Sequence, residues 1–166
     1  MGEHFGSQPI SKKDIQSINY SDYDAVVISD YDKGFLSYEA GLEIPRICKE
    51  ENVNLFVDSK KEDLSCYNMS IIKINELENN KVKKFPKKYN LIVTKGSQGA
   101  RFNGKEFPAV SALIDKLIVN KDYKRIRNGN ICGAGDSFIS GLVAHYSVYK
   151  NFESAIDFAN KCASIA

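Results

Sequence analysis

The sequence predicts an α/β fold of three layers, α/β/α, in which helices cover a mostly parallel sheet. Two observations predict this class. Compact apolar runs bounded by polar residues recur along much of the chain, as expected of buried strands. Stretches with helical periodicity separate several of these runs, which indicates right-handed crossovers between parallel strands. The length of 166 residues suits a single domain over 1–166 with a core of useful size.

Composition indicates a soluble globular protein. Hydrophobic residues make up 43% and charged residues 27% of the chain. The net charge of +2 is too small to predict a nucleic acid or an anionic membrane as partner. No run approaches the ~20 apolar residues of a membrane helix, and the start MGEHFGSQPISKKD has no apolar signal region. We therefore expect a cytoplasmic protein whose cysteines are free thiols.

The first elements are expected to be a helix, a strand and a second helix. The helix at 11–19 begins with a serine that can cap it. The apolar run AVVIS at 25–29 lies between two aspartates and predicts a strand that is buried on both faces. The helix at 37–51 also begins with a serine, and Pro45 must lie in its first turns or bend it.

Three more strands are expected at 53–58, 71–75 and 90–95, and a hairpin follows them. Two short strand-like pieces flank an Asn-Gly pair at 103–104, which is the strongest short-range signal for a hairpin. The same stretch spells GxxxxGK, but Glu106 stands where a phosphate-binding loop needs Ser or Thr. The hairpin is therefore the better interpretation.

Two helices are expected to close the chain. One starts at Gly133 and carries Phe138 and Leu142 on its apolar face, and the other covers 152–165. Residues 110–130 are polar, basic and irregular, and no element is assigned to them.

The segment NICGAGDSF at 130–138 carries the clearest chemistry. Its glycines let backbone N–H groups converge, and the helix start adds partial positive charge, so Gly133, Ala134 and Gly135 form a candidate anion hole. Asp136 lies at the same place and could accept the proton of a substrate hydroxyl as a general base. The alternative is that Asp136 only caps the helix. The spacing alone leaves both interpretations open.

GAGD followed by an apolar helix resembles the second signature of the ribokinase/PfkB family of carbohydrate kinases, and other segments agree in chain order. NELE at 75–78 is similar to the family's N-x-x-E, and TKGSQG at 94–99 is similar to its T-x-G-x-x-G turn. Within the family, SDYDKG at 29–34, VDSK at 57–60 and FAN at 158–160 resemble the heptose 7-phosphate kinases. The resemblance covers about residues 20–166, which correspond to the later half of a family member.

The resemblance implies a partial ribokinase-like fold, truncated to the nucleotide-binding half of an ATP-dependent kinase. The expected reaction is phosphorylation of the anomeric hydroxyl of a heptose 7-phosphate, a step of ADP-heptose biosynthesis, with Asp136 as catalytic base. ATP and Mg²⁺ are the implied cofactors; Asn75 and Glu78 would arrange magnesium and phosphate, with no residue expected to ligate the metal directly. The implied nucleotide-binding residues are Thr94, Lys95, Gly96, Gly99 and Asn160. Further candidates for the phosphate-rich region between the two substrates are Asp30, Lys33 and Lys60.

Departures from the family pattern keep a second hypothesis open. Asn130 stands where the family usually has Asp, at a position linked to a monovalent cation, so the resemblance does not extend to that cation. Cys132 replaces a usual Thr, and the interval from Glu78 to Thr94 is short for the helices that the family places there. The alternative to an enzyme is a non-catalytic nucleotide-binding or assembly module. The expected protein partner is a second copy of the chain or a complementary earlier half.

Two other features are expected to be structural. The five lysines between 81 and 88 predict a solvated loop rather than a nucleic-acid surface, because no base-stacking platform accompanies them. His145 lies on a predicted helix without a carboxylate or cysteine at ligand spacing, so we expect a packing residue.

Overall fold

The structure is a computed structural model that describes residues 8–109 and 133–165. The chain divides after Ile92 into two compact units. The first unit holds the parallel strands and the helix that packs on them, and the second holds a hairpin and two long helices. Asn130, Cys132 and the irregular segment 110–130 of the sequence analysis lie outside the described residues.

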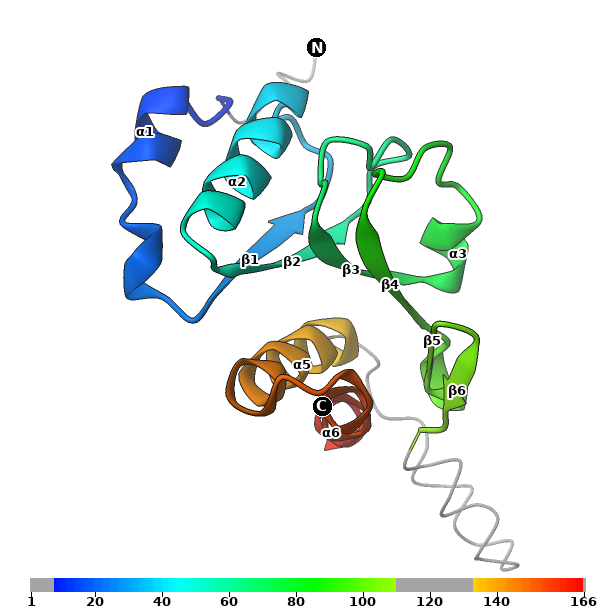
Figure 1. Cartoon of the computed structure of the whole chain (residues 1–166). Helices are drawn as coiled ribbons and strands as arrows, with labels where there is room; N and C mark the ends of the chain where they lie inside the picture. The colour runs from blue at the N-terminus through cyan, green and yellow to red at the C-terminus, as the bar shows by residue number, and fades with distance from the viewer. Residues whose placement is uncertain (1–7, 110–132, 166) are drawn as a thin grey trace, which may run out of the picture. The chain divides into compact units, whose positions relative to one another are not determined.

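The first unit is built on parallel strands in the positions that the apolar runs predict (Figure 1). β1 pairs with β2 and β2 pairs with β3, both in parallel. Neighbouring strands follow chain order from β1 to β6. β4 begins in the first unit and ends in the second. The strand bounds are β1 Ala25–Asp30, β2 Asn54–Ser59, β3 Ser70–Asn75 and β4 Tyr89–Thr94. These strands and the helices between them confirm an α/β fold with a mostly parallel sheet.

The helices of the first unit begin at the predicted caps. Ser11 accepts a hydrogen bond from the backbone of Asp14 at the start of α1, and Ser37 accepts one from Ala40 at the start of α2. Both serines therefore satisfy an N–H group that the first turn leaves without a helical partner. The bounds are α1 Lys12–Ser17, the 3₁₀ turn η1 Tyr20–Asp22, α2 Tyr38–Glu50 and α3 Glu76–Asn79.

Pro45 is buried in the middle of α2 rather than in its first turns. A proline there has no N–H group for the carbonyl of Gly41, four residues earlier, so α2 forgoes one internal hydrogen bond. Burial of Pro45 beside Ile44 and Cys48 offsets part of this cost.

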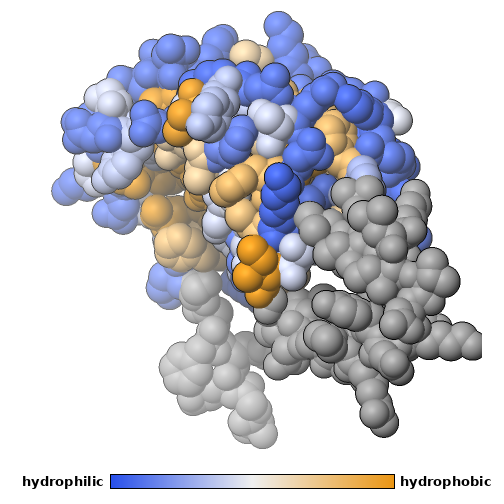
Figure 2. Space-filling model, turned by 90° about the horizontal axis from the view of Figure 1, so that it is seen from below, coloured by the Kyte–Doolittle hydropathy of each residue, from blue (hydrophilic) through white to orange (hydrophobic). Residues whose placement is uncertain are grey.

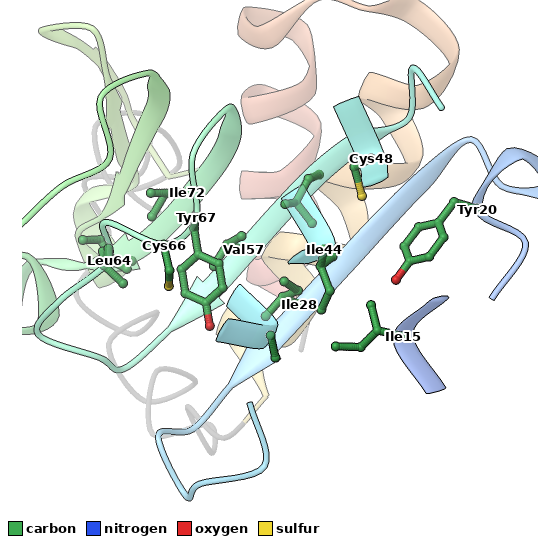
Figure 3. Close-up of a cluster of buried hydrophobic side chains, with 13 residues drawn as sticks. Ile15, Tyr20, Ile28, Ile44, Cys48, Val57, Leu64, Cys66, Tyr67 and Ile72 are labelled. Carbon is green, nitrogen blue, oxygen red and sulfur yellow. The ribbon is translucent and has the colours of Figure 1, made fainter. Parts of the chain in front are cut away.

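The core of the first unit lies between α2 and one face of the sheet (Figure 3). Alternate residues of a strand point to opposite faces, so Ile28, Val57 and Ile72 share the face toward α2. Tyr67 closes the cluster and is fully buried. Burial raises the pKa of the cluster's two thiols to about 11, so Cys48 and Cys66 are packing residues that stay protonated at neutral pH.

β1 differs from the sequence prediction of a strand that is buried on both faces. Ile28 is buried, but its neighbour Val27 is 47% exposed. The pattern fits a strand at the margin of the sheet, with one face covered by α2. β2 shows the expected double burial, because Leu55, Phe56 and Val57 are all buried.

The second unit begins with the predicted hairpin. β5 (Ala100–Phe102) and β6 (Lys105–Phe107) pair antiparallel. The two turn residues, Asn103 and Gly104, have positive φ angles of 48° and 79°. That is the backbone of a type I′ turn, which Asn-Gly pairs favour. The hairpin excludes a phosphate-binding loop between Gly99 and Lys105, because no helix follows the glycines.

Helices α5 (Ala134–Tyr149) and α6 (Phe152–Ile165) pack closely against each other. Gly141 permits this approach, since an added Cβ would lie 2.7 Å from the sulfur of Cys162. The ring of His145 lies beside those of Tyr149 and Phe158, at centroid distances of 4.5 Å and 5.2 Å. Among the described residues its buried Nδ1 has no hydrogen-bond partner. His145 is thus placed as a packing residue.

The surface carries several large hydrophobic side chains. Figure 2 shows hydrophobic residues in separate groups among a largely hydrophilic surface. No helix in the described part of the chain is long and apolar enough to span a membrane.

Candidate active site

The start of α5 leaves a set of backbone donors without helical partners. Gly133 precedes the helix in the left-handed region, with φ of 95°, which glycine adopts without strain. The first helical bond runs from the N–H of Ser137 to the carbonyl of Gly133, at 2.8 Å. The N–H groups of Ala134, Gly135 and Asp136 therefore lie in the first turn with no helical acceptor. Together with the helix dipole they favour an anion at this end of α5.

Asp136 is exposed in this first turn and is not the N-cap of the helix. Gly133, which has no side chain to accept a capping hydrogen bond, occupies the N-cap position. The interpretation that Asp136 merely caps the helix is therefore wrong. Its role as a base stays a prediction.

The turn at 94–99 is tightly folded within the second unit. Thr94 ends β4, and a 3₁₀ turn follows at Gly96–Gln98. The N–H of Lys95 donates to the carbonyl of Gly99 at 2.7 Å, which closes the turn. Gly96 and Gly99 have φ angles of 56° and 99°, so both positions favour glycine.

Gly99 and Asn160, far apart in the sequence, meet at the end of β6. A Cβ on Gly99 would lie 2.0 Å from the carbonyl oxygen of Phe107, so only glycine fits there. The buried amide of Asn160 donates to the same oxygen at 3.0 Å and to that of Pro108 at 3.4 Å. Gly99 and Asn160, both predicted to bind nucleotide, thus contact the same backbone segment at Phe107 and Pro108.

Lys95 forms an ion pair with Glu106, whose position in the sequence argues against a phosphate-binding loop. The Lys95 ammonium lies 3.2 Å from both carboxylate oxygens, and its side chain is 17% exposed. A bound phosphate would compete with Glu106 for this ammonium.

In the first unit, Asn75 and Glu78 hold each other in a capping box at α3. The N–H of Glu78 donates to Asn75 Oδ1 at 2.8 Å, and the N–H of Asn75 donates to Glu78 Oε2 at 2.9 Å. Carboxylate and carboxamide oxygens are suitable partners for Mg²⁺ or its bound water. The described residues contain no cluster of three or more His, Cys, Asp and Glu that could hold a metal. The residues fit a magnesium that is held chiefly by nucleotide phosphates and water.

Asp30 ends β1 as a buried, fully bonded carboxylate. It accepts hydrogen bonds from Lys61 Nζ, from Tyr67 Oη at 2.6 Å and from Ser59 Oγ at 3.2 Å, and the N–H of Asp32 donates to its other oxygen. Burial by itself raises the pKa of Asp30, but the bonds from Lys61 and Tyr67 outweigh it and hold that pKa below its usual value. Asp30 is therefore anchored as an anion.

Lys61, which sequence reasoning missed, fixes the loop that follows β1. Its ammonium donates to Asp30 at the start of the loop and to the carbonyl of Leu36 near its end, at 2.8 Å. The neighbouring Lys60 points elsewhere and lies 4.6 Å from the centroid of the Tyr31 ring. The Lys60 side chain is thus separate from the hydrogen bonds of the Asp30 carboxylate.

The loop after β1 also lines a shallow pocket of about 470 Å³. Tyr31 and Phe35 are about half exposed, and Lys33 adds a cationic side chain. The lining residues are Ser29, Asp30, Tyr31, Lys33, Phe35 and Leu36. Of the predicted substrate residues, Asp30 and Lys33 therefore share one pocket.

A buried ion pair between β2 and β3 is a second feature that the sequence analysis missed. Lys73 Nζ lies 2.7 Å from Asp58 Oδ2, and Lys73 is 5% exposed. The two residues are register partners on neighbouring strands. A lysine inside the apolar run IIKIN was the available signal, because buried lysines are almost always paired. Lys73 precedes Asn75 by two residues, and the ion pair lies on the face of the sheet away from α2.

The basic cluster at 81–88 is partly neutralised. Lys83 pairs with Glu62, and Lys84 lies 3.6 Å from a carboxylate oxygen of Asp63.

No helix lies between α3 and β4, so the short interval from Glu78 to Thr94 that the sequence shows is an irregular loop up to the start of β4.

Comparison with known proteins shows the family to which the chain is similar. The sequence pattern of the pfkB family carbohydrate kinases matches residues 53–166. The bifunctional protein HldE of Sulfurimonas denitrificans is 26% identical over an alignment that covers 95% of this chain and 36% of the relative. The protein of the same name from Marinomonas sp. is 29% identical, with coverage of 84% and 31%. The chain thus spans about a third of the length of the curated relatives it matches.

A solved structure shows the same fold. Arabidopsis thaliana ribokinase, complexed with ribose and ATP, matches with a TM-score of 0.63 at 15% identity. The match covers 95% of this chain and 53% of the plant protein. At this identity the likeness shows the fold alone, and it confirms the predicted three-layer, ribokinase-like class.

Proposed function

Because the chain belongs to the pfkB family of carbohydrate kinases, we propose that it is the nucleotide-binding half of a kinase that transfers the γ-phosphate of ATP to a heptose 7-phosphate. Residues 1–166 would form one truncated ribokinase-like domain, with the family resemblance over about 20–166. The choice of heptose 7-phosphate as the sugar is supported by the similarity to the HldE proteins and by the SDYDKG segment at 29–34, which resembles the heptose 7-phosphate kinases. The observation that carries the proposal is the start of α5, where an exposed carboxylate adjoins backbone donors with no helical acceptor.

In this proposal Asp136 accepts the proton of the sugar's anomeric hydroxyl as that oxygen bonds to the γ-phosphorus. The bond from the γ-phosphorus to the β,γ-bridging oxygen breaks, and ADP leaves with the electron pair. The N–H groups at Gly133–Gly135 stabilise the charge on the transferred phosphoryl group. Magnesium, arranged by Asn75 and Glu78, neutralises phosphate charge when it is bound.

The turn at 94–99 and Asn160 would border the nucleotide. Their shared contact with the end of β6 supports this role, because it brings two of the predicted nucleotide-binding positions together. Lys95 would exchange Glu106 for a phosphate oxygen.

The second candidate is a non-catalytic nucleotide-binding module. The absence of a helix between α3 and β4, where the sequence predicts a shortened connection, favours it. Both candidates bind nucleotide, and only the kinase requires the carboxylate of Asp136.

Phosphoryl transfer tests the proposal. We expect the 166-residue chain alone to phosphorylate heptose 7-phosphate only marginally, because orientation of the sugar and exclusion of water would come from the earlier half of the fold. Addition of an earlier half should give ADP formation that depends on the sugar. The measurement is ADP release with and without heptose 7-phosphate. Robust turnover by the isolated chain, or ADP release that ignores the sugar in the assembled pair, would contradict the proposal.

A further inference from the structure

The loop at 31–36, between β1 and α2, is held by contacts from outside itself. Asp32 has a φ angle of 56°, in the left-handed region that residues with a side chain seldom adopt. Its N–H group donates to Asp30 Oδ1 at 3.0 Å. Near the other end of the loop, the N–H group of Ile10 donates to the carbonyl of Phe35 at 2.9 Å. These bonds offset the cost of the backbone conformation.

Lys61 connects the two ends of this loop. Its ammonium donates to the carboxylate of Asp30, which ends β1, and to the carbonyl of Leu36 at 2.8 Å. The same ammonium lies 3.7 Å from a carboxylate oxygen of Asp32. The Lys61 side chain is largely buried, with 15% of its surface exposed. One cation thus contacts the residue before the loop, a residue within it and its last residue.

The charge of Lys61 also matters for the pocket that the loop lines. Asp30 and Lys33 both line this pocket, and Asp30 is buried. The other side chains that donate to the Asp30 carboxylate, Tyr67 and Ser59, are neutral hydroxyls. Lys61 therefore supplies the positive charge in direct contact with this carboxylate. Without it, a partly buried anion would repel a phosphate in the same pocket, because charges interact strongly where water is scarce.

We propose that Lys61 is a positioning residue of the pocket at 29–36: it compensates the charge of Asp30 and fixes the loop, so that the pocket accepts a phosphate group of the substrate beside Lys33. The inference rests on the proposed function, in which this pocket belongs to the phosphate-rich region between the two substrates. Lys61 acts through Asp30 and the loop and needs no contact with the phosphate. A loop that is fixed before binding also loses less conformational entropy when the ligand arrives.

Inorganic phosphate, titrated into the isolated chain, is the probe that tests this role. Lys61→Met removes the ammonium at similar length, Lys61→Arg keeps the charge, and Lys49→Met removes a lysine charge from an exposed position on α2 as the matched control. The readout is the NMR shift of the backbone amides of Tyr31 and Lys33. We expect saturable shifts in the wild type, the Arg variant and the control, and phosphate binding at least ~10-fold weaker in Lys61→Met.

Two further amides separate this role from a general loss of structure. Phosphate shifts of Gly135, at the start of α5, should be the same in the wild type and in Lys61→Met. The amide of Asp32, which donates to Asp30, should exchange with solvent at least ~10-fold faster in Lys61→Met, because the loop has lost its connection. An equal loss of phosphate binding at Gly135 would mean that the variant damages the whole chain and would overturn the assignment.

The kinetic consequence is a change in KM. In the chain assembled with an earlier half, Lys61→Met should raise the KM for heptose 7-phosphate at least ~10-fold. Turnover at saturating sugar and the dissociation constant of ADP should stay within a few-fold of wild type. The inference is overturned if phosphate leaves the amides of Tyr31 and Lys33 unshifted in the wild type, or if Lys61→Met binds phosphate as the wild type does. ADP release that ignores the sugar, together with phosphate binding that depends on Lys61, would contradict the proposed function and leave this inference standing.

Discussion

Asp136→Asn is expected to lower the turnover of the complete kinase by ~10²–10⁴. The substitution keeps the size and the hydrogen-bonding oxygen of the side chain but removes its ability to take a proton from the sugar hydroxyl. Nucleotide affinity should change little, because the backbone donors at Gly133–Gly135 do not involve this side chain. The measurement is steady-state turnover together with the dissociation constant of ADP. Turnover within a few-fold of wild type would eliminate Asp136 as the base.

Asp136→Ala serves as the companion variant. Because Gly133 is the N-cap, neither variant removes a capping side chain, and the alanine should cost only the ~0.3–1 kcal/mol of a carboxylate near a helix N-terminus. The activity of the Ala variant should fall as far as that of the Asn variant. A structural role would instead show a large loss of stability in Ala that the Asn variant escapes.

Lys73→Met is expected to destabilise the chain by ~3–5 kcal/mol, because it leaves the carboxylate of Asp58 largely buried without its partner. Methionine has a similar length, so the loss reports the missing charge rather than a cavity. Urea unfolding of the isolated chain, followed by circular dichroism, measures the effect.

The double variant Asp58→Leu, Lys73→Met is the control for this pair. Removal of both charges replaces the ion pair by apolar contacts, which is often neutral or stabilising. We therefore expect the double variant to recover most of the stability that Lys73→Met loses. A cost below ~1 kcal/mol for the single variant would show that the ion pair is not a structural requirement of the sheet.

Much of the fold follows from local signals in the sequence. The strands β1 to β4 lie where apolar runs predict them, because such runs can be satisfied only by burial. The caps at Ser11 and Ser37 and the turn at Asn103-Gly104 were predictable because each depends on a few adjacent residues.

Features that depend on register across strands were not predictable. Lys73 and Asp58 are fifteen residues apart, and only the alignment of β2 with β3 makes them neighbours. Lys60 and Lys61 differ by one position, yet of their two side chains only that of Lys61 reaches the Asp30 carboxylate, because successive side chains leave the chain in different directions. The sequence analysis singled out Lys60, whereas Lys61 is the lysine that bonds to the Asp30 carboxylate.

The start of α5 shows what structure adds to a motif. GAGD left open whether Asp136 is a cap or a reactive group, since both roles place an acid at a helix start. The structure contradicts only the cap, because Gly133 is the N-cap and Asp136 is exposed in the first turn. The role of Asp136 as a base stays a prediction.

Titration of the isolated chain with ADP and magnesium tests most directly the central claim that the chain is a nucleotide-binding unit. The account predicts saturable heat in calorimetry and a rise in melting temperature, since a ligand at 100 times its dissociation constant stabilises the folded state by ~2.7 kcal/mol. Omission of magnesium should weaken both signals, and Asp136→Asn should leave them nearly unchanged. The absence of heat and of any thermal shift at millimolar ADP and magnesium would contradict the account.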